Sequence, residues 1–434
     1  MLGVNDLKNE RISLNVKSPD FDNLLDEIKN RKIVLIGEST HGTHEFYSLR
    51  SKITKKLIED HGFNTVAIEG DWPDVFRVNQ FVKGLGRDNT AIESMSDMER
   101  FPLWMWRNQI VTNFIEWLKD TNRDRENKVG FYGLDLYGMK NSIRAILEIT
   151  KEKFPDLYEE TRDLYSCFQT SLSDAANYGR RVALKKHKSC QDQVVKELQL
   201  VREEFFNRLN DLSDKEEYLH VEQNAQAVVA AESYYRNLFN PGVSTWNIRD
   251  KHMFETLKSI DEWISSEETG KIIVWAHNSH VGRAESGYRT SLGETTLGEL
   301  VADHYKDMSF CVGLFTSEGS VTAAHNWDEP GHYFHLNEPI KGSYEDLFHR
   351  VGGDFMLGSD TLKEIERPML ERAVGVIYRP ETERNSHYFE SNLSSRYDWI
   401  IYVDKTSAIE PIDDLEYWQP MLKGREKDFY PSSL

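Results

Sequence analysis

The chain has 434 residues, 39% of them hydrophobic and 29% charged, which is an ordinary composition for a globular protein. Its 53 basic and 72 acidic residues give a net charge of −19, which argues against a nucleic-acid or anionic-membrane partner. The N-terminal segment lacks an apolar signal region, and no stretch reaches the roughly 18 consecutive apolar residues of a transmembrane helix. We therefore expect a soluble, cytoplasmic protein of one elaborated domain or several average ones, and the composition leaves its oligomeric state open.

The cysteine content agrees with a cytoplasmic location. Cys167, Cys190 and Cys311 are odd in number and widely spaced, and none belongs to a CxxC pair. This pattern fits reduced thiols, and it fits neither a disulfide framework nor a zinc knuckle. We therefore expect all three thiols to be free.

Residues 1–152 alternate between strand and helix patterns. The predicted strands are Ile33–Ile36, Thr65–Ile68 and Lys128–Tyr132, and the predicted helices are Phe21–Lys29, Thr43–His61, Trp72–Val82, Phe101–Asp120 and Gly138–Lys151. This alternation is typical of a mostly parallel sheet flanked by helices. We interpret the segment as the first part of an α/β catalytic domain.

The pattern changes between residues 153 and 265 and then returns. Long polar helices dominate this middle segment, namely Lys185–Leu209, Glu217–Leu238 and Asn247–Trp263. Strand patterns resume in residues 266–434, at Lys271–Trp275, Ser309–Phe315, Val374–Tyr378 and Trp399–Val403. The sequence therefore predicts a large helical insertion, or lid subdomain, between the two parts of one α/β domain.

Acidic residues and histidines follow the predicted strands. They are Glu38 and His41 after the first strand, Glu69 and Asp71 after the second, Asp135 after the third, and His277 and His280 after Lys271–Trp275. Each one alone has a simple explanation as a hydrogen-bonded histidine or a helix-capping acid. Because the carboxyl ends of parallel strands meet at one edge of a sheet, we expect these side chains to share one pocket.

Arg50 interrupts the apolar stripe of the helix that follows the first strand. Phe46, Leu49, Ile53 and Leu57 form this stripe at helical spacing, so Arg50 points inward with them. A buried charge needs a partner, and we expect Arg50 to contact a carboxylate or a substrate anion.

Two catalytic schemes fit these residues, since the chain contains no GxSxG, P-loop or GxGxxG motif. A histidine oriented by a glutamate can activate water while other histidines or Arg50 hold the oxyanion. The same residues can instead ligate a divalent metal that activates the water, because the HxxH spacings at 41/44 and 277/280 suit either scheme. A further alternative is a non-catalytic protein that binds a polysaccharide fragment or a haem-like ligand, with the tryptophans at 104, 106 and 117 forming a wall of its cleft.

Several motifs resemble those of the erythromycin esterase family, including members often labelled succinoglycan biosynthesis proteins. They are GESTHGTHEFYSLR from Gly37, AIEGDW from Ala67, WAHNSHVG from Trp275, GVIYRPETERNSHYF from Gly375 and DWIIYVDKTSAIEP from Asp398. The resemblance implies an α/β sheet covered by helices, with a cleft at its carboxyl edge. It also implies ester hydrolysis by a histidine-activated water, without a covalent intermediate.

The same resemblance assigns roles to individual residues. His41 corresponds to the general base and Glu38 to its supporting acid, Arg50 and Glu69 match further functional positions, and His277 and His280 match the pair that binds or polarises the reacting group. We expect four further residues to contact substrate: His44, Asp71, Asp135 and Arg249. The sequence thus predicts a hydrolase of a small-molecule ester, either a macrolactone or another acyl ester. No cofactor is certain, and a divalent metal stays open.

Overall fold

The structure is a computed structural model, and it describes residues 4–168, 174–208, 215–265, 270–284, 293–365, 367–413 and 415–418. A run of parallel strands forms its centre. In spatial order these strands are β11 (Trp399–Thr406), β6 (Ser309–Ala323), β2 (Ile33–Ile36), β5 (Ile272–Trp275), β3 (Thr65–Asp71) and β4 (Gly130–Asp135). Each is parallel to its neighbour. The sequence predicted a strand at each of these positions.

Shorter antiparallel strands extend the sheet on the side away from β4. β8 (Phe355–Leu357) pairs with β11, and β1 (Ile12–Ser13) pairs with β8. β7 (His332–His335) forms a hairpin with the end of β6, and β9 (Met369–Arg372) pairs with β10 (Tyr388–Ser391) in a separate small sheet. The sheet is therefore mixed but mostly parallel, which confirms the predicted fold class.

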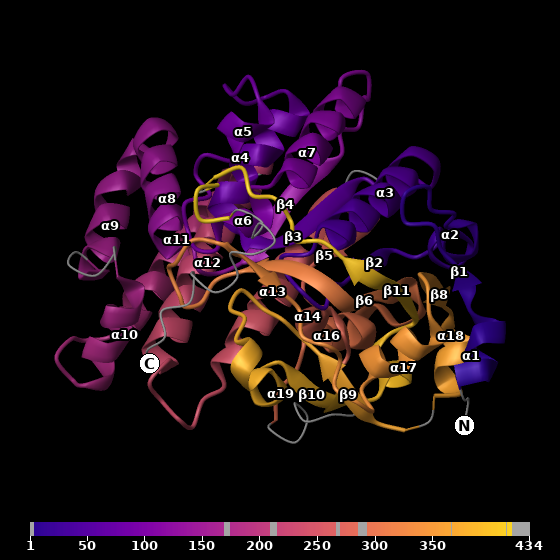
Figure 1. Ribbon diagram of the computed structural model, residues 1–434. Coiled ribbons are helices and arrows are strands. Elements are labelled where there is room, and N and C mark those ends of the chain that lie inside the picture. Colours follow the sequence, from indigo (N-terminus) through magenta and orange to yellow (C-terminus); the bar gives the residue numbers. More distant parts are fainter. Residues whose placement is uncertain are drawn as a thin grey trace.

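Helices cover both faces of the sheet because successive residues of a buried strand point to opposite sides. Val34 and Ile36 pack beneath α2 (Asp22–Ile28), α3 (His44–Asp60) and α7 (Gln109–Asn122). Ile33 and Leu35 pack on the other side, toward α13 (Thr245–Ser265), α16 (Leu297–Tyr305) and α17 (Tyr344–Val351). Figure 1 shows the two helical layers on either side of the strands. Outside the helical subdomain, the other helices of the described residues are α1 (Val4–Glu10), α4 (Trp72–Lys83), α5 (Ala91–Ser94), α6 (Leu103–Trp106), α14 (Asn278–Val281), α18 (Ser359–Lys363), α19 (Glu383–Ser386) and α20 (Leu393–Arg396). Short 3₁₀ turns lie at Ser166–Phe168, Lys306–Met308 and Pro380–Thr382.

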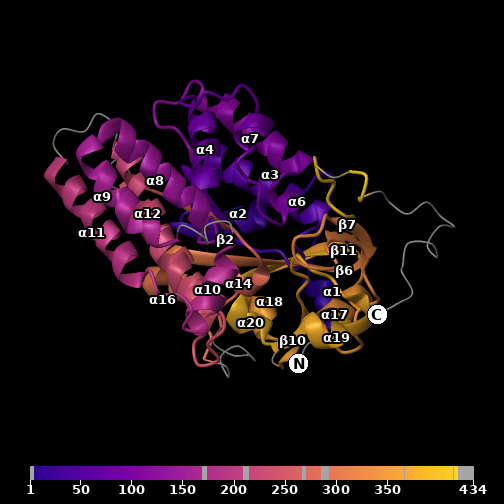
Figure 2. The same ribbon diagram turned by 90° about the vertical axis from the view of Figure 1, so that its left-hand side faces the viewer.

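A helical subdomain lies beside the end of the sheet that carries β4. It contains α8 (Met139–Lys153), α9 (Pro155–Tyr165), α10 (Ala175–Ala183), α11 (Gln191–Arg208) and α12 (Lys215–Asn237), which gather on one side of the molecule in Figures 1 and 2. These helices share their own apolar core, in which Ile143, Tyr165 and Val228 are buried. Its boundaries differ from the predicted segment of residues 153–265, because α8 belongs to this core whereas α13 packs on the sheet through Met253 and Leu257.

Other predictions differ from the structure in ways that have local causes. The predicted helix Phe101–Asp120 is divided into α6 and α7, because the Asn108 side chain accepts a hydrogen bond from the Val111 amide and starts a new helix. The predicted strand Val374–Tyr378 is absent from this part of the described chain, since Val374 pairs with the loop at Ser39–His41 instead of with a strand.

The expectation of three free thiols is wrong. Cys167 and Cys190 form a disulfide within the helical subdomain, with their Cα atoms 5.9 Å apart, while Cys311 is free and buried. The two paired cysteines are 23 positions apart in the sequence, so a search for closely spaced pairs misses them. The cysteines therefore no longer support the expected cytoplasmic location, since that argument depended on free thiols. Among the described helices, none is long and apolar enough to cross a membrane.

Candidate active site

Ionisable side chains from neighbouring strands meet at the carboxyl edge of the sheet. Glu38 follows β2, His277 follows β5, and Glu69 and Asp135 lie at the ends of β3 and β4. All four are at most 5% exposed. A cleft of about 1030 Å³ opens over this edge, and the predicted residues His41, Glu69, Asp71, Asp135, Arg249, His277 and His280 line it.

Gly37 lets the turn after β2 lie directly against the turn after β5. A Cβ atom at Gly37 would stand 2.0 Å from Oδ1 of Asn278, so no larger residue fits there without displacing that side chain. The Asn278 amide also donates a 2.8 Å hydrogen bond to the Glu38 carbonyl. The backbones that carry Glu38 and His277 are therefore fixed relative to each other.

Glu38 is held between His41 and Arg50 in the interior. Its Oε1 lies 2.9 Å from Nδ1 of His41, and its Oε2 accepts a 2.5 Å hydrogen bond from Nη2 of Arg50. Burial raises the pKa of Glu38, whereas the positive charge of Arg50 and the hydrogen bond to His41 oppose that rise. A carboxylate at Nδ1 favours the His41 tautomer that carries its proton there, which leaves Nε2 as the acceptor.

Arg50 is fully buried and does not line the cleft. Its guanidinium lies over the rings of Tyr47 and Trp275, at 4.5 and 5.5 Å from their centroids. The expected carboxylate partner of Arg50 is thus Glu38. The alternative that Arg50 holds a substrate anion or the oxyanion is wrong, because α3 keeps it behind the glutamate.

His277 lies beside His41, with their ring centroids 4.6 Å apart. Its amide donates a 2.8 Å hydrogen bond to Oε2 of Glu69, and its Nδ1 accepts one of 3.2 Å from the amide of Ser279. Burial, together with the neighbouring His41, holds the pKa of His277 well below its usual range. The ring is therefore neutral with its proton on Nε2, which is a buried atom, and the ring also interacts with the Ser39 backbone.

His280 is fixed from several directions. Nδ1 of His280 is 2.9 Å from Oδ1 of Asp250, and its Nε2 is 3.0 Å from Nη1 of Arg249. The indole of Trp246 stacks on the imidazole at 4.3 Å with an angle of 2° between the planes. Asp250 is fully buried and also accepts a hydrogen bond from the Leu297 amide. Because its carboxylate is held in this way, it fixes the orientation of His280.

Arg249 joins two of the predicted acids. It donates to Oε1 of Glu69 at 2.7 Å and to both carboxylate oxygens of Asp135 at 3.0 and 2.6 Å. Burial alone would raise the pKa of Glu69, but the electrostatic interactions with His280 and with the positive charge of Arg249 hold it well below the usual range. Glu69 is therefore an anion that anchors Arg249 and the His277 backbone.

Asp71 contacts another arginine that the sequence did not single out. It precedes α4, yet its side chain caps no amide of that helix, and its Oδ2 accepts a 2.7 Å hydrogen bond from Arg100 instead. Asp74, one turn further on, lines both the cleft and a second pocket of about 370 Å³ between α4, α8 and α12. Burial, and then the nearby Asp71, raise the pKa of Asp74 to about 8.

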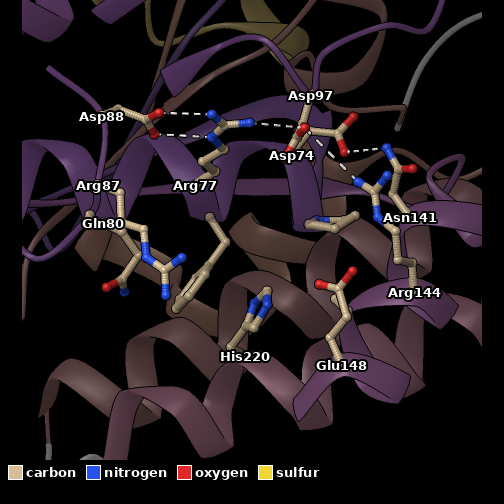
Figure 3. A pocket seen from close by; sticks show the side chains of 14 residues that line it. Asp74, Arg77, Gln80, Arg87, Asp88, Asp97, Asn141, Arg144, Glu148 and His220 are labelled. Carbon is tan, nitrogen blue, oxygen red and sulfur yellow. Dashed lines mark hydrogen bonds and ion pairs between the residues drawn. The ribbon is translucent and has the colours of Figure 1, made fainter. Parts of the chain in front are cut away.

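Figure 3 shows this second pocket, in which Arg77 joins Asp88 to Asp97 above the buried ring of His220. Asp74 accepts a 2.7 Å hydrogen bond from Asn141 of α8. Asp74 lines both cavities, so the N-terminal turn of α4 lies between this pocket and the cleft.

Some predicted residues lie away from the cleft. His44 is the first residue of α3, its side chain is exposed, and it does not line the cleft. Of the predicted tryptophan wall, Trp106 lines the cleft, whereas Trp104 and Trp117 pack in or against the apolar core.

Sequence reasoning missed Asp250, Trp246 and Arg100. Asp250 precedes Met253 and Leu257 at helical spacing, and this pattern was a signal that could have identified it as a buried acid.

The donor set does not fit the metal-centre alternative. Within the described residues, no three His, Cys, Asp or Glu side chains are placed to hold a metal ion. Nδ1 of His41 is directed to Glu38 and Nδ1 of His277 to Ser279, while both nitrogens of His280 have partners. The Nδ1 atoms of the three histidines therefore already have protein partners.

A buried glutamate–histidine pair beside two further histidines, under a large cleft at the edge of a parallel sheet, is an arrangement suited to acid–base chemistry. The chain belongs to the erythromycin esterase family, whose model matches residues 58–406. This confirms the resemblance drawn from the motifs and supports a hydrolase of that type.

Individual relatives agree with this assignment. The chain is 23% identical to erythromycin esterase type II of Escherichia coli, over 94% of this chain and 98% of the relative. It is 20% identical to erythromycin esterase type I of Escherichia coli, over 67% and 72%.

Solved structures share the fold. A succinoglycan biosynthesis protein matches with a TM-score of 0.76 at 20% identity, covering 94% of this chain and 97% of that one. An erythromycin esterase mutant in its open conformation matches with a TM-score of 0.66 at 15% identity, covering 91% and 97%.

Proposed function

We propose that this protein hydrolyses a small-molecule ester, a macrolactone or another acyl ester, with a water molecule activated by His41. The observation that carries the proposal is the contact between Glu38 and His41, at 2.9 Å, with Arg50 fixing the far side of the carboxylate. Family membership supports the same class of reaction. A base that lines the cleft, with its acid partner behind it, is the arrangement that general-base catalysis needs.

In this reaction, water gives a proton to Nε2 of His41 while its oxygen attacks the ester carbonyl carbon. The electron pair of the carbonyl double bond moves to its oxygen, and the imidazoles of His277 and His280, which line the cleft, stabilise that oxyanion. The bond to the alcohol oxygen then breaks, and His41 returns its proton to that oxygen. An acid and an alcohol leave, and no covalent enzyme intermediate forms.

The other residues position these groups. Glu38 keeps the proton of His41 on Nδ1 and stabilises the imidazolium that forms during attack. Glu69 holds the His277 backbone, and Arg249 places a positive charge beside His280 at the cleft wall. The low pKa of His277 keeps its imidazole neutral beside His41 at physiological pH.

The test compares His41→Ala and Glu69→Gln with wild type on a panel of esters. We expect His41→Ala to lower kcat/KM by about a hundredfold or more, the usual contribution of a general base. His44→Ala is the matched control, since His44 lies three positions away and points to solvent. If His41→Ala and Glu69→Gln both match wild type on every accepted ester, the assignment is wrong.

The same protein samples separate an enzyme from a binding protein. A ligand that stabilises wild type against heat but is never turned over would favour binding alone. Macrolides, acyl sugars and porphyrins form a suitable panel, because they cover the ligand classes that the cleft could hold.

A further inference from the structure

Trp327 is an unusually exposed aromatic residue at the mouth of the cleft. Its side chain is 65% exposed, and among the described large hydrophobic residues only Leu85 and Leu184, at 64% and 58%, are similarly exposed. Neither leucine lines the cleft, whereas Trp327 does. An indole left in water at the mouth of a cleft is apolar surface that a ligand can cover.

The loop that carries Trp327 is held in place. It joins β6 to β7, and residues Ser320–Ala323 of β6 pair with His332–His335 of β7 in an antiparallel ladder. Glu329 accepts hydrogen bonds from the amide and the side chain of Asn326, and the next residue after the tryptophan, Asp328, takes a left-handed conformation with φ 64°. Phe101 contacts the indole edge-on, with the centroids 5.4 Å apart. These contacts therefore hold the indole ring of Trp327 in a defined orientation.

An apolar wall leads from Trp327 to the catalytic edge. Phe101, Leu103 and Met105 line the cleft in succession, and Trp106 follows them. The Trp106 indole donates a 2.9 Å hydrogen bond to the Glu69 carbonyl, so this wall ends at the strand that carries Glu69. A ligand that rests on the wall has its other end beside the histidines.

Polar groups line a different part of the same cleft. Arg100 precedes Phe101 in the chain but is paired with Asp71, and its guanidinium stacks over the Tyr137 ring at 4.6 Å. Tyr137 in turn contacts Tyr234 of α12, with a 3.2 Å hydrogen bond between the two hydroxyl groups. The cleft thus offers an apolar surface and a hydrogen-bonding surface, and its volume exceeds the need of a simple acetate ester.

We propose that Trp327 is the recognition platform for a facially amphiphilic, ring-bearing ester, whose apolar face covers the indole and the Phe101–Trp106 wall while hydroxyl groups on its other face meet Asp71, Arg100 and the tyrosines. This substrate class rests on the proposed ester hydrolysis. Trp327 touches the part of the substrate far from the reacting bond, so it sets specificity and affinity and leaves the chemistry to His41.

The probe is methyl cholate, a rigid steroid ester with hydroxyl groups on one face. Two esters serve for comparison: methyl 5β-cholanoate, which lacks these hydroxyl groups, and 4-nitrophenyl acetate. We expect Trp327→Ala to raise KM for both steroid esters by about tenfold, with kcat and the acetate reaction nearly unchanged. Trp327→Phe should restore part of the affinity. Leu85→Ala, an equally exposed position outside the cleft, should behave like wild type. We expect wild type to prefer methyl cholate to the hydroxyl-free ester.

Calorimetric binding of methyl cholate to the His41→Ala protein tests the platform without turnover. Weaker binding after Trp327→Ala in that background supports the proposal, even if no ester is hydrolysed and the proposed function fails. Absent binding, or equal binding with and without Trp327, overturns it. An equal loss of the steroid and acetate reactions in Trp327→Ala also overturns it, because that result indicates a general structural effect.

Discussion

Arg50 donates a 2.5 Å hydrogen bond to Glu38, and neither side chain has any exposed surface. The pair joins α3 to the turn after β2, directly behind the proposed base. A buried ion pair is costly to break from one side, because the remaining charge has no solvent to stabilise it.

The first prediction concerns this pair. Arg50→Met should lower the free energy of unfolding by about 3–5 kcal/mol, because it leaves Glu38 buried without its counter-ion. Adding Glu38→Gln should restore part of that loss, since the uncompensated charge is then removed. Urea unfolding measures both effects. Arg123→Met is the control, because Arg123 pairs with Asp120 on the surface and should cost at most about 1 kcal/mol. Equal losses at Arg50 and Arg123 would contradict the argument.

Asp250 should act through His280. Asp250→Asn removes the charge that fixes the imidazole, and we expect kcat/KM to fall by about tenfold to a hundredfold, mostly in kcat. Asp261→Asn is a matched substitution of another buried acid on α13, where the partner is Lys32 and the cleft is not involved. Similar losses of activity in the two variants would show that Asp250 only supports the helix.

Asp74 should make stability depend on pH. Its pKa rises from 3.8 to about 8 on folding, so between these values the folded protein holds more protons than the unfolded chain. The free energy of unfolding should therefore fall as pH rises through this window, with a limiting slope of about 1.4 kcal/mol per pH unit for one proton. Asp74→Asn removes this contribution and should flatten the slope in urea unfolding between about pH 5 and 8.

Asp88→Asn serves as the control for Asp74. The hydrogen bond from Arg77 lowers the pKa of Asp88, so its stabilising contribution is lost only when pH falls toward the acid range. Between about pH 5 and 8, the free energy of unfolding of Asp88→Asn should therefore change with pH as it does in wild type. If Asp74→Asn keeps the wild-type slope, the carboxyl is ionised throughout this range and the prediction fails.

The disulfide between Cys167 and Cys190 predicts how many cysteines react with a thiol reagent before and after reduction. Protein unfolded in guanidinium without reductant should react with a thiol reagent at one site, Cys311, and after reduction at all three cysteines. Cys167→Ser should destabilise the helical subdomain by about 2–4 kcal/mol under oxidising conditions and little under reducing ones. Three reactive thiols before reduction would show that Cys167 and Cys190 are not paired.

Local sequence patterns predicted the parts of the site that lie at strand ends. Glu38, Glu69, Asp135 and His277 each follow or end a short apolar run, and the rule that parallel strands end at one edge brings them together. Arg50 was predicted to be buried for a similar reason, because helical periodicity places it on the apolar side of α3. Its partner Glu38 could be named only once the helix and the turn were seen together.

Other features depend on contacts between distant segments. Asp250 matters because α13 crosses the edge of β4 and faces the turn after β5, and no local pattern encodes that crossing. Val374–Tyr378 has the composition of a strand, yet its hydrogen bonds go to the loop at Ser39–His41 and to Ala324, which follows β6. The disulfide links two helical-subdomain segments that have no motif in common.

The strand order places the strand ends that carry the proposed catalytic groups in one contiguous half of the sheet. β2, β5, β3 and β4 carry the ionisable groups, while β1 and β8 lie beyond β6 and β11 at the opposite border. We therefore expect a modification at this border to have little effect on the proposed reaction. A tether or fusion attached near Ile12–Ser13 would hold the molecule by its non-catalytic side and leave the mouth of the cleft open to large substrates.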